Sequence, residues 1–127
     1  MSKFRTPLKN VRGLGSAKYG TEHFIHQRLT ATALVFLGIW FVCLLVGLVG
    51  ADYVTAVETV SKPWNAVLLV GLLVAMFWHA QLGLQVVLED YIHNSLLALA
   101  LQVIVKFVAV LGAIVSIFAV ARIVLGN

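Results

Sequence analysis

The stretch WNAVLLVGLLVAMFWHAQLGLQVVL, residues 64–88, decides the fold class of this chain. It contains 25 residues, and His79 is the only one whose side chain carries a group that ionises near neutral pH. A helix of roughly 20 residues, rising about 1.5 Å per residue, spans the roughly 30 Å hydrocarbon core of a bilayer. The stretch therefore predicts one transmembrane helix, and its histidine needs a chemical explanation.

Two further apolar runs flank this stretch, at residues 29–50 and 96–125. The first carries no charge, whereas Lys106 and Arg122 interrupt the second. The whole chain of 127 residues is 61% hydrophobic and 11% charged, whereas about a quarter of the residues in a soluble domain are charged. The sequence predicts an all-α integral membrane protein whose three transmembrane helices run up, down and up.

The third apolar run is too long to lie wholly in lipid. We expect Asn94 and Ser95 to cap its helix, and Lys106 to extend its ammonium group to one interface. The first three turns then project into the headgroups or against a partner. One domain, residues 1–127, accounts for the chain, with spans at about 29–50, 64–88 and 106–125.

The distribution of basic residues predicts the orientation. Six Lys or Arg residues against one Glu give residues 1–28 a net charge of +5, whereas the loop at 51–63 has a net charge of −1. The positive-inside rule then makes 1–28 a cytoplasmic N-terminal segment and places the 90–94 turn on the same side. The sequence pI near 9.6 is explained by this topology without a nucleic-acid partner.

His79 lies about ten residues, or roughly 15 Å, from the inner end of the second predicted helix, which places it near the bilayer centre. An unpaired polar group there costs several kcal/mol, so the imidazole needs a partner. One hypothesis is a neutral imidazole that is hydrogen-bonded to a neighbouring helix. The other is an axial ligand to a haem held between helices.

The spacing around His79 favours a cofactor face. Gly83 follows by four residues on the same side of the helix, where a missing side chain lets a flat ring or another helix approach. Asp90 follows by eleven residues, three turns plus about 20°, and lies some 16 Å nearer the cytoplasm. Leu82 and Val86 would form the apolar lining between them.

Four of these positions carry a resemblance to a known family. The pattern of His79, Gly83, Asp90 and Tyr91 resembles the second helix of the small cytochrome b anchor of succinate dehydrogenase, the D-type subunit of respiratory complex II. The segment FIHQRLTA, residues 24–31, is similar to the same family's aromatic residue followed by Arg, Thr and Ala. Size and three-span layout agree, and RGLGSAKYGTEHF is most similar to the alphaproteobacterial branch.

The resemblance implies a subunit without independent activity in an enzyme of the bacterial inner membrane. Its expected partners are a flavoprotein, an iron–sulfur subunit and a second cytochrome b anchor that shares the helical bundle, one haem b and the ubiquinone site. His79 would be one axial ligand of the haem iron, and the second would come from another chain. Tyr91 would donate to a quinone carbonyl, Asp90 would lie near that site, and Arg28 would meet the haem propionates or the quinone pocket.

Each assignment has a simpler alternative. Tyr91 could belong to the aromatic belt at the membrane surface, Asp90 could be a solvated acid, and Arg28 could be an interface anchor. The chain as a whole could anchor a fumarate reductase, form a cofactor-free scaffold or conduct protons. His23, His26 and His93 are expected at surfaces or partner contacts. Four glycines are expected at helix-packing positions: Gly38, Gly47, Gly71 and Gly112.

Overall fold

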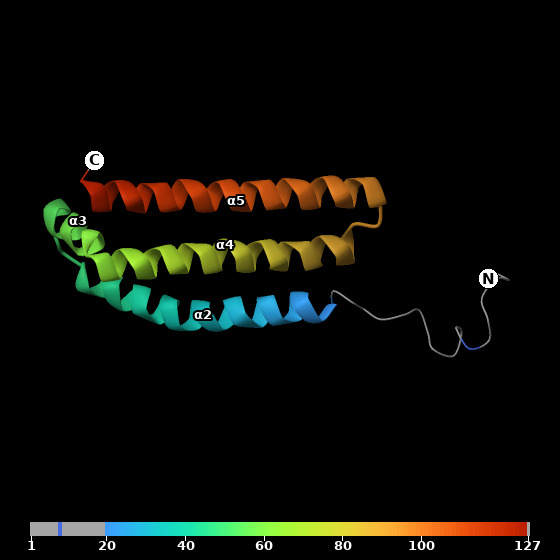
Figure 1. Ribbon diagram of the computed structural model, residues 1–127, viewed down its shortest axis with the longest axis horizontal. Coiled ribbons are helices and arrows are strands. Elements are labelled where there is room, and N and C mark those ends of the chain that lie inside the picture. Colours follow the sequence, from blue (N-terminus) through green and yellow to red (C-terminus); the bar gives the residue numbers. More distant parts are fainter. Residues whose placement is uncertain (1–7, 9–19, 127) are drawn as a thin grey trace.

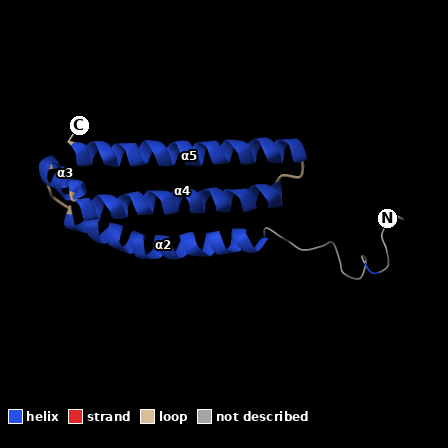
Figure 2. Cartoon of the chain, in the orientation of Figure 1, coloured by secondary structure: helices blue, strands red, loops and turns tan. Residues whose placement is uncertain are grey.

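The computed structural model of the protein describes residue 8 and residues 20–126. In that part of the chain all regular secondary structure is helical, as Figure 2 shows by colour. The long helices are α2 (Gly20–Gly47), α4 (Pro63–Tyr91) and α5 (Ser95–Leu125), and a short helix α3 (Tyr53–Ser61) joins the first two. Each long helix is long and apolar enough to cross a membrane. The predicted all-helical membrane fold is therefore confirmed.

The three long helices form an open layer with α4 in the middle (Figure 1). Helix α4 packs against both α2 and α5, whereas α2 and α5 do not contact each other within the described residues. The helices run up, down and up. The start of α2 and the α4–α5 turn lie at one end of the layer, and α3 lies at the other. Helix α4 is therefore covered on two sides only, by α2 and by α5, and its other two sides are not covered by a long helix of this chain.

Local signals in the sequence explain where the helices begin and end. Pro63 occupies the first turn of α4, where its missing N–H would have had no helical partner. The side-chain oxygen of Asn94 accepts hydrogen bonds of 3.1 Å from the amides of both Leu96 and Leu97, which confirms the predicted cap of α5. Gly126 ends α5 in a left-handed conformation with φ of 74°.

Two features of the described chain were not expected. Helix α2 begins at Gly20, nine residues before the predicted span, because no helix-breaking residue interrupts 21–28 and Glu22 favours the first turn electrostatically. The predicted 51–63 loop contains α3, which Asp52 caps by accepting from the Thr55 amide at 3.0 Å. Hydrogen bonds from Thr55 lower the pKa of Asp52 below its ordinary value of 3.8. The predicted basic segment before residue 20 lies largely outside the described residues.

Very little of the chain is buried in itself. Among the described residues only four side chains are buried, namely Thr30, Ala66, Ala75 and Leu82. Large apolar side chains are exposed along all three long helices. A soluble monomer rarely exposes large contiguous apolar patches, so these faces are suited to lipid and to partner helices.

One glycine sets the contact between α4 and α5. A Cβ atom at Gly112 would lie 2.6 Å from Cε1 of Phe77, so any larger residue there would force the Phe77 ring to move. The predicted packing role is confirmed for Gly112 within this chain. It stays a prediction for Gly38 and Gly47, where a Cβ atom would have no neighbour within 4 Å among the described residues, and Gly71 shows only an ordinary contact with a side chain of α2.

Candidate functional site

His79 is held from α4 against α2 by a buried hydroxyl group. Its Nδ1 lies 3.0 Å from Oγ1 of Thr30, whose residue is only 7% exposed. The same hydroxyl lies 2.8 Å from the carbonyl oxygen of His26 and 3.2 Å from that of Gln27. A hydroxyl has one hydrogen, which is directed to these carbonyls, so Thr30 accepts from His79. This network assigns the imidazole proton to Nδ1.

The second ring nitrogen of His79 keeps its lone pair in this tautomer. The side-chain nitrogen of Gln27 approaches that Nε2 at 3.4 Å, which is long for a hydrogen bond. The predicted hydrogen bond to a neighbouring helix is therefore present, with a short bond through Nδ1 to Thr30 and a longer one through Nε2 to Gln27. Because imidazole binds a metal through one nitrogen while the other is oriented by a hydrogen bond, the two hypotheses for His79 are compatible.

A pocket of about 380 Å³ lies beside His79 between α2 and α4, and we call it the His79 pocket. Its wall includes His23, Gln27, Arg28 and Val86. Within the described part of the chain, the buried atoms Oε1 of Gln27 and Nε2 of His23 have no hydrogen-bond partner. Buried polar atoms are normally paired, so this wall is suited to a further polar group from a ligand or another chain.

Arg28 lines the His79 pocket, and its predicted contact with haem propionates or a quinone stays a prediction. Its guanidinium carbon is 5.2 Å from the centre of the Phe24 ring, which fits a cation–π contact. The contact holds a permanent positive charge on the wall that also carries His23 and Gln27. Such a wall can bind an anionic group.

Gly83 leaves the surface next to His79 flat. A Cβ atom there would meet Nε2 of Gln27 at 3.8 Å, an ordinary contact, so packing within this chain does not require glycine. The predicted role of Gly83, close approach of a flat ring or another helix, remains a prediction. No group of three or more potential metal ligands occurs within the described residues.

The structure separates the four predicted site residues into two groups. His79 and Arg28 share one pocket, whereas Asp90 and Tyr91 lie at the end of α4, about eleven residues further along. Asp90 is exposed and Tyr91 is 76% exposed. A site formed by Asp90 and Tyr91 therefore needs a second wall from outside the described residues.

Sequence reasoning missed three residues of the His79 pocket and its support. These residues are His23, Gln27 and Thr30. Successive members are four and three residues apart, which places all three on the side of α2 that meets α4. That polar stripe was visible in the sequence. It was not recognised because we expected the first span to begin only at residue 29.

Comparison with known proteins gives a consistent result over nearly the whole chain. Residues 2–121 match the family described as "Succinate dehydrogenase/Fumarate reductase transmembrane subunit". The chain is similar to three proteins named "Succinate dehydrogenase hydrophobic membrane anchor subunit". The relative from Rickettsia bellii (strain RML369-C) is 32% identical over 117 residues, covering 92% of this chain and 94% of the relative.

The other two relatives come from a second Rickettsia and from Paracoccus. The protein from Rickettsia conorii (strain ATCC VR-613 / Malish 7) is 30% identical over 119 residues, covering 91% of this chain and 94% of its own length. The protein from Paracoccus denitrificans is 27% identical over 125 residues, covering 98% and 95%. No solved structure matches the chain significantly.

Proposed function

The chain belongs to the family of succinate dehydrogenase and fumarate reductase transmembrane subunits, and we propose that it anchors a succinate dehydrogenase in the bacterial inner membrane. The observation that carries this proposal is the family match over residues 2–121 together with three helices that can cross a membrane. The names of the relatives favour succinate dehydrogenase over fumarate reductase. The flavoprotein and iron–sulfur subunits would dock at the end of the layer that carries the α4–α5 turn.

His79 would hold the iron of haem b through Nε2. The proposal is supported by the hydrogen bond from Nδ1 to Thr30, which orients the ring and leaves Nε2 as an acceptor. Arg28 meets the propionates, and Gly83 leaves room for the ring beside His79. When bound, the haem supplies one-electron redox chemistry.

A second residue that holds the haem would come from the other cytochrome b anchor. His23 lines the same pocket one turn of α2 before Gln27, and its Nε2 has no hydrogen-bond partner within the described residues. His26 is also on α2, and its ring lies 5.3 Å from that of Trp78. An open layer of three helices provides a free face for the partner anchor.

Tyr91 and Asp90 form this chain's part of the ubiquinone site. The proposal is supported by their place at the end of α4 and by their exposure, which leaves both side chains free for a quinone and a partner subunit. The Tyr91 hydroxyl donates a hydrogen bond to a quinone carbonyl and so stabilises negative charge on that oxygen during reduction. Asp90 lies beside the route by which protons arrive.

Purification of the assembled complex through this chain in a gentle detergent tests the proposal. We expect the flavoprotein, the iron–sulfur subunit and a second anchor to co-purify, with a b-type reduced-minus-oxidised absorbance spectrum and succinate-dependent ubiquinone reduction. The same subunits without the spectrum would indicate a cofactor-free anchor. Faster fumarate reduction than succinate oxidation would favour fumarate reductase, and absence of the flavoprotein would contradict the anchor function.

The proposed orientation places the N-terminus in the cytoplasm and Lys62 outside. Intact cells that carry Lys9→Cys or Lys62→Cys can be treated with a membrane-impermeant thiol reagent. We expect label at position 62 and none at position 9 until the cells are broken. The reverse pattern would overturn the topology and move the quinone site to the other side of the membrane.

A further inference from the structure

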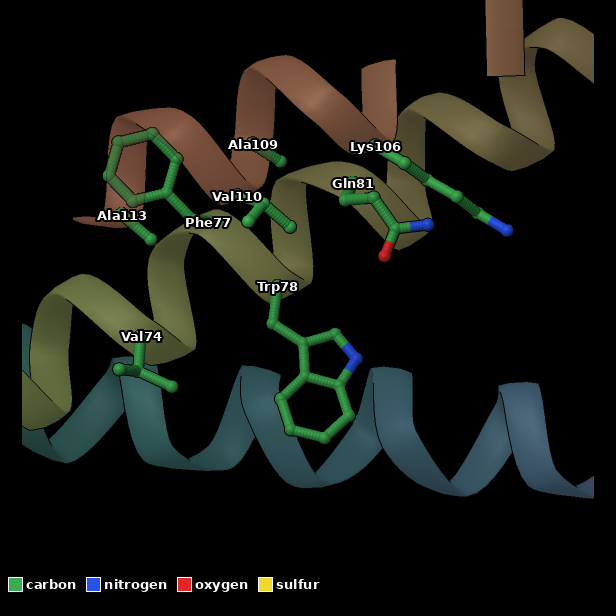
Figure 3. A pocket seen from close by; sticks show the side chains of 8 residues that line it. All are labelled: Val74, Phe77, Trp78, Gln81, Lys106, Ala109, Val110 and Ala113. Carbon is green, nitrogen blue, oxygen red and sulfur yellow. The ribbon is translucent and has the colours of Figure 1, made fainter. Parts of the chain in front are cut away.

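A second pocket lies on the other side of the helix layer. It has a volume of about 360 Å³, lies between α4 and α5, and is lined by residues that include Phe77, Trp78, Gln81, Lys106 and Ala113 (Figure 3). We call it the Lys106 pocket. His79 and Gln81 are two residues apart and therefore about 200° apart around α4, so this pocket and the His79 pocket face opposite ways.

The Lys106 pocket is polar at one end and apolar at the other. Gln81 and Lys106 lie at the end nearer the α4–α5 turn, and Figure 3 shows their side chains away from Phe77 and Ala113. Because α4 and α5 are antiparallel, Phe77 on α4 and Ala113 on α5 both lie further from that turn. The polarity of the pocket therefore changes along the helices, which is the direction of the membrane normal.

Lys106 brings a positive charge into a pocket without an acidic residue in its lining. Its position is eleven residues into α5, or about 16 Å along the helix axis. A lysine at this depth is unfavourable unless its ammonium group finds an anion or reaches the interface. Residues 107–125, about 28 Å of helix whose only charged residue is Arg122 near the far end, begin directly after it, which places Lys106 at the edge of the hydrocarbon core.

Two glutamine side chains hold the carboxylate of Glu89, on α4 near the α4–α5 turn. Glu89 accepts hydrogen bonds through Oε1 from Gln85 at 2.9 Å and from Gln102 at 3.4 Å. Gln102 precedes Lys106 by one turn of α5. The amide of Gln81 in turn lies 3.5 Å from Oε1 of Gln85, so a row of polar side chains leads from the helix ends to the pocket.

We propose that the Lys106 pocket binds one anionic phospholipid from the leaflet that contains the α4–α5 turn. The phosphate pairs with the Lys106 ammonium group and accepts from the Gln81 amide, and part of an acyl chain lies against Phe77 and Ala113. The change from polar to apolar along the membrane normal matches a lipid, whose charged group and chains are ordered in the same way. This site requires membrane insertion but neither haem nor quinone.

Lipid retention by the assembled complex tests the proposal. The complex is placed in nanodiscs of equal parts phosphatidylglycerol and phosphatidylcholine, released into detergent, and its retained lipids are counted by native mass spectrometry. We expect retention of phosphatidylglycerol in preference to phosphatidylcholine. Lys106→Gln should reduce its retention by roughly fivefold, the factor for about 1 kcal/mol per basic residue beside an anionic lipid.

Matched variants distinguish lipid bound in the Lys106 pocket from lipid attracted by any basic residue near the membrane surface. Arg122→Gln removes a cation from the other end of α5 and should leave phosphatidylglycerol retention unchanged, and Lys106→Arg should preserve it. Ala113→Phe fills the apolar end, keeps the charge and should also lower retention. Haem absorbance in each sample reports assembly, so loss of lipid with normal haem is distinct from failure of the proposed function.

Three results would overturn the proposal. One is equal phosphatidylglycerol retention by the wild type and Lys106→Gln. Another is a carbodiimide cross-link between Lys106 and an acidic residue of a partner subunit, which would assign the pocket to a partner helix. If Lys106→Gln does not assemble, unchanged retention in Ala113→Phe would be equally decisive.

Discussion

Thr30 and His79 are joined across the α2–α4 contact by a hydrogen bond of 3.0 Å, in which the imidazole Nδ1–H donates to the threonine hydroxyl. The hydroxyl can accept because its own hydrogen is directed to helix carbonyls one turn earlier. A single buried threonine thereby sets both the orientation and the tautomer of the histidine. Nε2 is left as the nitrogen that can bind iron.

Replacing Thr30 by Val should weaken haem binding, because Val has nearly the same shape but cannot accept from Nδ1. Loss of such a supporting hydrogen bond typically lowers metal affinity by roughly ten- to hundredfold. Haem per complex and the spectrum of the oxidised haem measure the effect. Thr30→Ser should restore both, because it keeps the hydroxyl.

Thr32→Val is the matched control for this substitution. Thr32 lies on the same helix, is exposed, and donates to the carbonyl of Arg28 at 2.9 Å without contacting His79. Haem content should be normal in this variant. Full haem content in Thr30→Val as well would contradict the positioning role of Thr30.

If His79 binds the haem iron as proposed, replacing it by Leu should remove that ligand. The complex should lose haem or retain it in an altered spin state, because one coordinate bond is gone. Absorbance and electron paramagnetic resonance spectra of the purified complex distinguish these outcomes from the wild type. An unchanged six-coordinate spectrum in His79→Leu would show that the iron is bound elsewhere.

Replacing Tyr91 by Phe distinguishes a quinone ligand from an aromatic belt residue. If the hydroxyl donates to a quinone carbonyl, its loss costs roughly 1–3 kcal/mol, or a five- to more than hundredfold loss of quinone affinity. Succinate-dependent quinone reduction should fall, while succinate oxidation with a soluble acceptor that bypasses the membrane site should remain. Two unchanged rates would assign Tyr91 to the belt, and two equally lowered rates would indicate failed assembly.

Replacing Gly112 by Ala should destabilise the contact between α4 and α5. The added methyl group would overlap the ring of Phe77, and overpacking of this kind costs about 1–3 kcal/mol. The temperature at which the complex loses succinate-dependent quinone reduction should fall. Gly38→Ala is the control, because a Cβ atom there meets nothing within 4 Å.

A compensating change makes the Gly112 prediction more specific. Shortening Phe77 to Leu in the Gly112→Ala background removes most of the ring that the methyl group would meet. The double variant should recover part of the lost thermal stability. Equal inactivation temperatures for the wild type and Gly112→Ala would contradict the proposed close contact.

The sequence by itself determined the membrane class, the number of long helices and their alternating direction. Apolar runs that match the bilayer thickness are local features, and Asn94 caps α5 through neighbouring amides, so both can be recognised without knowledge of the fold. The stripe of His79, Gly83 and Asp90 was visible for the same reason, because spacing along one helix defines its face.

Only the tertiary structure decided what these residues meet. The packing of helices that are distant in the sequence sets three relationships. It places α4 between α2 and α5, Thr30 against His79, and Lys106 in one pocket with Gln81. Apolar side chains such as Leu and Val suit lipid and a helix contact equally well, so hydropathy does not choose between them. The choice is made where small or polar side chains meet across a contact, as Gly112 does with Phe77 and Thr30 with His79.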